Sequence, residues 1–140
     1  KRQDLRQRTG VQALPVGRQA IREVYRRLSQ GGIVGILPDQ VPGRAGGLQS
    51  EFLGRPVRTM SLIHRLVQST GCAVMMGRCF YKPVAGEQNS EPAYQLKITL
   101  APDEVEDFDP LVSARALDGA VESVLQEAIP QYLWTYKRWK

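Results

Sequence analysis

The most informative stretch of this sequence is Gly31-Gly32-Ile33-Val34-Gly35-Ile36-Leu37-Pro38-Asp39-Gln40. Residues 33–37 form a short apolar run with β-branched side chains, which is typical of a buried strand. Pro38 ends the run, so Asp39 lies just past the carboxyl end of the predicted strand. A loop rich in Gly and Pro follows over residues 40–47. Because ligands bind outside the carboxyl ends of strands in open α/β sheets, the stretch predicts a fold class and a candidate site together.

Helical patterns flank this run on both sides. Upstream, the apolar side chains of residues 18–30 share one face, which predicts a helix that the glycine pair ends. A short strand is predicted before it, over residues 11–16. Downstream, a second helix is predicted over residues 59–70, with Thr59 as its N-cap and Gly71 as its C-cap.

The remaining segments complete an α/β pattern. Residues 48–58 are expected to be irregular or to hold a short extended piece. Apolar segments over residues 72–81 and 93–100 predict a hairpin. An acidic loop then leads into a helix over residues 111–128, before Pro130. This order of elements predicts an α/β fold in which parallel strands and one antiparallel hairpin form the sheet.

Length and composition exclude several classes of protein. The chain has 140 residues, 42% hydrophobic and 24% charged, which fits one globular domain and excludes disordered, collagen-like and coiled-coil chains. Its 2 Cys are too few for a disulfide scaffold, and with 1 His they argue against a structural zinc site. The apolar runs are too short to span a membrane.

Positive charge is concentrated in the first half of the chain. Residues 1–78 have a net charge of +9, with twelve Arg for one Lys, whereas residues 79–140 have −4. Arg is well suited to phosphate and carboxylate groups. We therefore expect an anionic partner: nucleic acid, anionic lipid, a phosphorylated substrate or an acidic protein. A solvated basic face without a partner explains the same charges.

The loop after the apolar run holds the sharpest candidate site. Asp39 and Arg44 lie there among glycines whose N–H groups can approach an anion, although Pro-Asp and Pro-Gly pairs are also ordinary turn formers. The loop matches neither a P-loop nor a dinucleotide fingerprint. His64, the single imidazole, has no acid at a suitable spacing and is expected to be an ordinary helix residue. The residues by themselves supply no catalytic base.

The tail, residues 132–140, interleaves aromatic and basic side chains. It has three interpretations: a membrane-interface belt, a stacking surface for nucleic acid, or a terminal segment packed on the core with its Lys and Arg exposed. We favour the third, because two Trp usually mean a buried segment.

Motifs along nearly the whole chain resemble the C-terminal half of the bacterial lipid A biosynthesis late acyltransferases (the lauroyl/myristoyl acyltransferase family). The resemblance implies a glycerol-phosphate-acyltransferase-like mixed sheet with flanking helices, present here as a partial domain. Two positions depart from the family pattern: Gln49-Ser50-Glu51 replaces an apolar Val-Pro, and Tyr136 stands where many members have His. The matching motifs are Arg6-Gln7-Arg8, the stretch from Gly31 to Gln40, Phe52-Leu53-Gly54-Arg55-Pro56-Val57-Arg58-Thr59, Pro130-Gln131-Tyr132-Leu133-Trp134 and Lys137-Arg138-Trp139-Lys140.

The resemblance implies an acyltransferase whose base lies elsewhere. In the family, a His followed after four residues by Asp or Glu deprotonates a hydroxyl of a lipid A precursor, which attacks the thioester of acyl carrier protein. Nothing in this sequence matches that motif or the family's N-terminal membrane anchor. We therefore expect residues 1–140 to be the C-terminal part of a single acyltransferase domain. Alone it should be inactive and should expose apolar surface, which favours dimerisation or aggregation.

The resemblance also implies a set of substrate-binding residues: Arg6, Arg8, Asp39, Gln40 and Arg44. The arginines would hold anionic groups of the lipid head or of the carrier protein, and the Asp39 loop would line the acceptor side of the cleft or only brace the catalytic His. No metal, cofactor or nucleic acid is implied. The parent protein would act at the cytoplasmic face of the bacterial inner membrane.

Two alternatives stay open at this point. One is a related acyltransferase with a lysophospholipid or aminolipid as its acceptor. The other is a non-catalytic basic module that binds anionic lipid or nucleic acid with strong salt dependence. The order of the motifs favours the lipid A acyltransferase.

Overall fold

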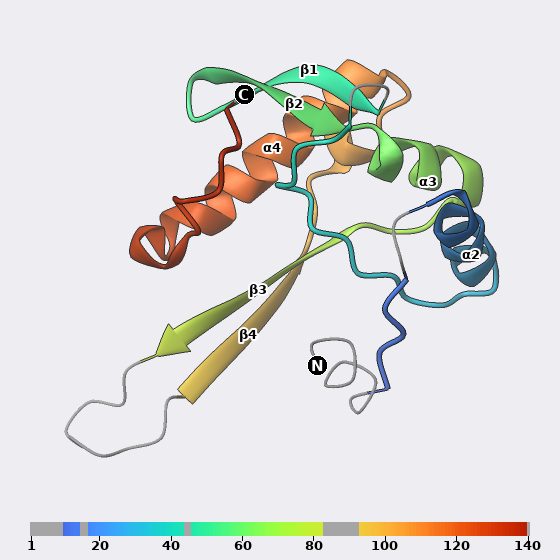
Figure 1. The fold of residues 1–140 in the computed structure, drawn as a ribbon, viewed down its shortest axis with the longest axis horizontal. Coiled ribbons are helices and arrows are strands. Elements are labelled where there is room, and N and C mark those ends of the chain that lie inside the picture. The colour runs from blue at the N-terminus through green and yellow to red at the C-terminus, as the bar shows by residue number, and fades with distance from the viewer. Residues whose placement is uncertain (1–9, 15–16, 44–45, 83–92, 140) are drawn as a thin grey trace. The chain divides into compact units, whose positions relative to one another are not determined.

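The chain forms a mixed α/β structure, shown as a computed structural model in Figure 1. It divides into two compact units, Lys1–Gly35 and Ile36–Lys140. The first contains helix α2, and the second contains four strands with helices α3 and α4. The structure describes residues 10–14, 17–43, 46–82 and 93–139.

Helix α2 (Arg18–Ser29) confirms the predicted helix. Val24, on its apolar face, is buried, and two arginines in its last turn, Arg26 and Arg27, lie near the negative end of the helix dipole. Gly31 follows with φ +75°, a left-handed conformation that Gly adopts without strain. The helix therefore ends where the glycine pair predicted.

The described residues of the two strands predicted near α2 do not form strands. Residues 11–14 and 32–37 have no strand conformation. Side chains over residues 33–37 alternate between exposed and half-buried, and Ile33 is 96% exposed. A β-branched run favours strand conformation, but a strand also needs a neighbour for its N–H and C=O groups, and no described segment pairs with this one. The prediction of a buried strand at residues 33–37 is therefore wrong for the described part of the chain.

Strands β1 (Gly47–Phe52) and β2 (Arg55–Met60) form a hairpin where we expected irregular structure. Phe52 pairs with Arg55, which leaves a two-residue turn. Both turn residues have positive φ, 52° at Leu53 and 69° at Gly54, as a type I′ turn requires. Its turn therefore matches the twist of the two strands.

Helix α3 (Leu62–Thr70) begins later than predicted because Thr59 belongs to strand β2. Ser61 occupies the N-cap position instead. Gly71, with φ +63°, is the C-cap and its N–H bonds the Val67 carbonyl, which confirms the predicted end. Thr59 cannot cap the helix because it is buried and its hydroxyl donates a hydrogen bond to Asp118 on α4.

Strands β3 (Met75–Lys82) and β4 (Ala93–Leu100) form the predicted antiparallel hairpin. The first strand begins three residues after the predicted start at Cys72. Both sheets of the described chain are two-stranded and antiparallel, so the predicted parallel pairing is not formed there. The α/β class itself is confirmed.

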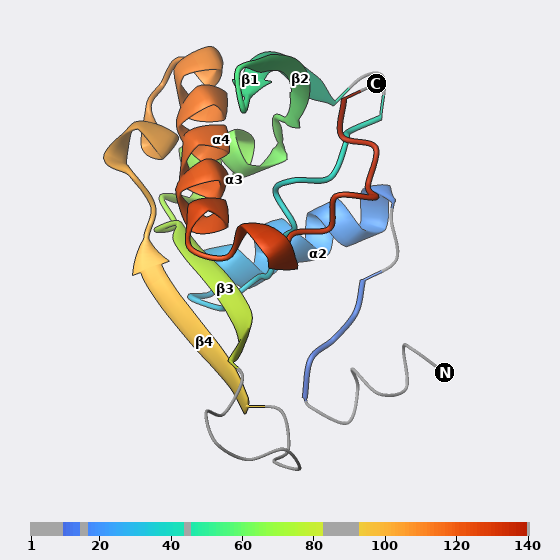
Figure 2. The ribbon, with the colours of Figure 1, turned by 90° about the vertical axis from the view of Figure 1, so that its left-hand side faces the viewer.

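Helix α4 (Pro110–Gln126) confirms the last predicted helix and organises the core. The Asp109 side chain caps it by accepting from Leu111 N at 2.8 Å. The short 3₁₀ helices η1 (Asp103–Glu106) and η2 (Ile129–Gln131) lie before and after it. Figure 2 shows α4 beside the β1–β2 hairpin.

No described helix is long and apolar enough to cross a membrane.

Two apolar clusters of buried side chains both include residues of α4. The buried members of the first cluster come from β1, β2 and α4, and those of the second from α3, η1 and α4. They are Phe52, Val57, Val121 and Leu125 in the first, and Ile63, Val67, Val105 and Leu117 in the second.

Candidate functional site

Asp39 lies in a turn over residues 38–40 of the second unit, which we call the Asp39 turn. Its side chain is half-buried, and that of Gln40 is exposed. The backbone N–H of Val41, the next residue, donates a hydrogen bond to the Tyr136 hydroxyl, with N···O 2.8 Å. The turn is therefore tied directly to the C-terminal segment.

The loop after the turn packs against the start of β1. The Gly43 carbonyl accepts from Gly46 N at 3.0 Å, and the Gly46 carbonyl accepts from Ser61 N at 3.0 Å. A Cβ on Gly47 would lie 2.7 Å from Pro42 Cγ, closer than side-chain atoms approach. A glycine is therefore needed at residue 47 for the loop to approach the hairpin this closely.

Tyr132 is a half-buried residue of the C-terminal segment whose hydroxyl has no hydrogen-bond partner among the described residues. Burial raises the pKa of Tyr132; the negative charge of Asp39 also raises it, whereas Arg138 lowers it. The Tyr132 ring lies 6.2 Å from that of Phe52, centroid to centroid, so its position is set by the core.

Arg138 belongs to a buried polar cluster that sequence reasoning missed. Its guanidinium pairs with the Asp118 carboxylate on α4 and lies over the Phe52 ring, 3.8 Å from Cζ to the centroid. The other Asp118 oxygen accepts a hydrogen bond from the Thr59 hydroxyl at 2.5 Å. All three polar residues are 2% exposed or less. We call Thr59, Asp118 and Arg138 the Asp118 cluster.

Burial and pairing act on Asp118 in opposite directions. Burial raises the pKa of its carboxyl, while the hydroxyls of Ser50 and Thr59 and the charge of Arg138 favour the ionised form. Removing one member of a buried pair leaves an uncompensated charge, at a cost of about 3–5 kcal/mol. The cluster therefore fixes the C-terminal segment firmly onto α4.

One sequence signal points to Asp118. It lies four residues after Ala114 and three before Val121, on the apolar stripe of the predicted helix. A carboxylate on such a stripe needs a buried partner. Spacing does not identify that partner, because Arg138 lies 20 residues away in a segment without regular periodicity.

The structure supports the interpretation of the tail as a segment packed on the core. The Trp139 ring lies 5.8 Å from that of Phe52, and its Nε1 donates to the Phe52 carbonyl at 3.4 Å. The expectation that the tail's basic residues are all exposed is wrong: Lys137 is exposed, but Arg138 is buried. The buried carboxylate of Asp118 draws it inward.

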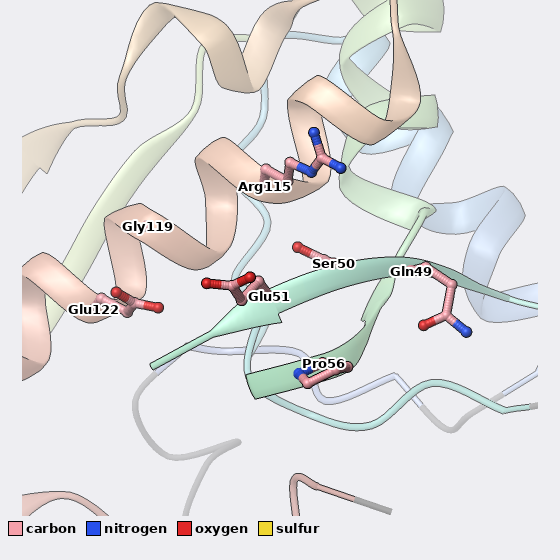
Figure 3. A pocket seen from close by; sticks show the side chains of 7 residues that line it. All are labelled: Gln49, Ser50, Glu51, Pro56, Arg115, Gly119 and Glu122. Carbon is pink, nitrogen blue, oxygen red and sulfur yellow. The ribbon is translucent and has the colours of Figure 1, made fainter. Parts of the chain in front are cut away.

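An open pocket of about 460 Å³ lies between the β1–β2 hairpin and α4 (Figure 3). The carboxylates of Glu51 and Glu122 point into it, and Arg115 lies at one side. Two facing carboxylates make it a poor site for a phosphorylated ligand. Neither Asp39 nor Gln40, the two predicted binding residues that the structure describes, lines it. The lining residues are Gln49, Ser50, Glu51, Pro56, Arg115, Gly119 and Glu122.

Of those five predicted residues, the structure places Asp39 and Gln40, which are neighbours in one turn. Arg6, Arg8 and Arg44 lie outside the described residues. The structure therefore brings two candidates together and shows what holds them.

His64 lies on α3 with its Nδ1 buried and without a hydrogen-bond partner among the described residues. No described carboxylate orients it as a general base. Cys72 and Cys79 are both free thiols. Within the described ranges, no group of three or more His, Cys, Asp or Glu is arranged to hold a metal ion.

Comparison with known proteins assigns the chain to a family. The sequence profile described as bacterial lipid A biosynthesis acyltransferase matches residues 1–140. The chain belongs to this family. No curated protein matches it. The Asp39 turn and the Asp118 cluster both lie inside the region that the acyltransferase profile covers.

Proposed function

We propose that this chain forms the acceptor-binding part of an enzyme that moves a fatty acyl chain from acyl carrier protein to a hydroxyl of a lipid A precursor. Membership of the lipid A acyltransferase family supports the reaction class. The Asp39 turn, tied through Val41 to Tyr136, is the observation that carries the site. A carboxylate held in this way offers a fixed acceptor for the hydrogen of a substrate hydroxyl.

The general base is expected in another part of the parent protein. The single His of this chain, His64, is not followed by Asp or Glu at the spacing that the family uses. In the proposed reaction the base takes the proton of the acceptor hydroxyl, and the oxygen attacks the thioester carbonyl carbon. An ester bond forms, the C–S bond breaks, and the proton passes to the leaving thiolate. Asp39 holds the acceptor or braces the base in this scheme, and it transfers no proton.

Arginine side chains supply the anion binding in this proposal. Arg6, Arg8 and Arg44 would pair with phosphate groups of the lipid head or with acidic side chains of the carrier protein. The net charge of +9 over residues 1–78 supports an anionic substrate or partner. The proposed location is the cytoplasmic face of the inner membrane, where both substrates meet, and no cofactor is required.

The test is acyl transfer by the full-length parent protein and its Asp39→Asn variant, which removes the charge and keeps the shape. We expect transfer from acyl carrier protein to a lipid A precursor to fall about 100-fold, because misplacing a reacting group by about 1 Å has an effect of this size. Asp103→Asn, at an exposed acidic residue of η1, is the matched control and should leave transfer unchanged.

The outcomes separate the two parts of the proposal. Wild-type rates from Asp39→Asn would show that the turn is not part of the site. Transfer to a lysophospholipid or an aminolipid in place of a lipid A precursor would overturn the choice of acceptor and leave the site standing. Tight, salt-dependent binding of nucleic acid without transfer would favour the non-catalytic basic module.

A further inference from the structure

We infer that the C-terminal segment, residues 132–139, is a positioning strap for the Asp39 turn. This inference rests on the proposed function, because there the Asp39 carboxylate holds the acceptor or braces the base. The strap is anchored in the core through Arg138 and reaches the backbone directly after the turn through the Tyr136 hydroxyl. Its side chains contact the turn rather than a reacting group, so they are positioning residues.

The anchored end is held by four kinds of contact. Arg138 is 2% exposed, pairs with Asp118 and lies over the Phe52 ring. Trp139 adds a ring contact and a hydrogen bond to the same Phe52. A charge buried this deeply cannot leave its partner without a large penalty, so this end does not slide along α4.

Short internal hydrogen bonds set the length of the strap. Trp134 N donates to the Tyr132 carbonyl at 2.9 Å, Tyr136 N to that of Leu133 at 3.0 Å, and Arg138 N to that of Tyr136 at 2.9 Å. The Trp134 indole also donates to the Ile129 carbonyl at 2.9 Å, which fixes the start of the strap beside η2. The distance from the anchor to the Tyr136 hydroxyl is therefore defined by the backbone.

The reaching end holds the backbone directly after the turn. Beyond the turn, the Tyr136 hydroxyl accepts the Val41 N–H at 2.8 Å. The negative charge of Asp39 is one of the influences that raise the pKa of Tyr132. Residues 32–37, which precede the turn, lie in no strand, so sheet pairing does not position it from that direction. The strap supplies the constraint that a sheet would otherwise provide.

Because Tyr136 is partly exposed, its effect on the position of the turn can be tested without unfolding the protein. Its side chain lies at the surface, 36% exposed, where the loss of a single neutral hydrogen bond does not unfold the protein. A hydrogen bond at this place still fixes the direction of the adjacent backbone. Functional side chains must be held to within about 0.5 Å, which a turn without strand neighbours does not achieve alone.

The experiment removes one oxygen atom from the full-length protein, by Tyr136→Phe. Tyr94→Phe is the matched control, because Tyr94 lies on β4, is 70% exposed and is far along the chain from the turn. Two quantities are measured: the amide hydrogen-exchange rate of the peptide containing Val41, and KM and kcat with each substrate varied in turn. The exchange rate needs no assumption about the reaction.

We expect Tyr136→Phe to raise exchange at Val41 about tenfold and to raise KM for the lipid acceptor by a similar factor, since one neutral hydrogen bond is worth about a tenfold change in an equilibrium. KM for acyl carrier protein should stay the same, which general loss of structure would not produce. Tyr94→Phe should change none of these quantities.

Two results would overturn the inference. Unchanged exchange at Val41 would mean that the hydroxyl does not hold the turn. Faster exchange with both KM for the acceptor and kcat unchanged would mean that the turn is held but that its position does not matter. If the wild-type protein transfers no acyl group, the proposed function fails instead, and the exchange rate still decides whether the strap holds the turn.

Discussion

The two hairpins of this chain have the same topology but are covered differently. The β1–β2 hairpin lies on α4 and buries Phe52, Val57 and Thr59. Strand β4 is exposed along its whole length, and the β3–β4 hairpin leaves one face exposed on both strands, on which no side chain is charged. Cross-strand pairing and exposure define this exposed face as Met75, Gly77, Cys79, Tyr81, Tyr94, Leu96, Ile98 and Leu100.

The opposite face of β3–β4 carries the charged anchors. Arg78 and Lys97 both pair with Glu127 at the end of α4, and burial of Met76 adds an apolar contact. The pairing lowers the pKa of Glu127, first through the hydrogen bond from Arg78. Alternation along a strand thus predicts which residues share a face but not which face is covered. A contiguous exposed apolar face is typical of a surface that another element or partner covers.

The largest expected difference between the two hairpins is the loss of stability when the carboxylate of the ion pair beside each one is removed. Asp118→Ala should lower the free energy of unfolding by about 3–5 kcal/mol, because it leaves Arg138 buried without a partner. Glu127→Ala on the β3–β4 side should have a much smaller effect, since water already reaches a carboxylate that is 46% exposed. Urea unfolding of the full-length protein measures both.

A double variant distinguishes the loss of the Asp118–Arg138 ion pair from the loss of packing around Asp118. Asp118→Leu combined with Arg138→Met removes both charges and keeps apolar volume, and such replacements are often neutral or stabilising. Recovery of most of the loss caused by Asp118→Ala would confirm that the unpaired charge is responsible. A double variant as unstable as the single one would assign the effect to packing.

A matched pair of leucines tests the difference in covering. Leu125, on α4 over the β1–β2 hairpin, is 6% exposed, and Leu96, on β4, is 66% exposed. Leu125→Ala should lower the free energy of unfolding by about 2–5 kcal/mol, and Leu96→Ala should change it by about 0.5 kcal/mol or less. A loss of more than about 2 kcal/mol at Leu96 would show that the exposed face is covered in the full-length protein.

Sequence patterns predicted the elements that local periodicity determines. Helices α2 and α4 and the β3–β4 hairpin follow from apolar spacing and turn residues. The β1–β2 hairpin was missed because Gln49 and Glu51 interrupt its apolar pattern and Leu53-Gly54 is not a typical turn pair. Its stability comes from contact with α4, which no local pattern reports. At residues 33–37 a strand was predicted and is not formed, because strong strand propensity does not supply a pairing partner.

The candidate site also contains one residue that a local pattern predicted and one cluster that it did not. Asp39 was predicted as a site residue because it follows an apolar run interpreted as a strand. The structure forms no strand at residues 33–37, so that ground is wrong and the role of Asp39 stays a prediction. The Asp118 cluster was not predicted, because it joins residues 59 and 20 positions apart along the chain. Contacts of this length are set by tertiary packing, and they determine how Asp39 is held.

The smallest expected effect is a dependence of stability on pH. It arises from Tyr132, whose ring packs near Phe52 of the β1–β2 hairpin. The pKa of Tyr132 is raised, chiefly by burial beside Phe52, so the folded protein keeps this proton above about pH 10, where the unfolded chain loses it. Its contribution to stability is complete below that pH and is lost as the pH rises through the folded-state value. Tyr132→Phe lacks this loss, so the wild-type protein should fall in stability relative to the variant in alkaline solution. Unfolding measured from neutral to alkaline pH for both proteins tests this, and a constant difference between them would mean that Tyr132 is not shielded by the hairpin.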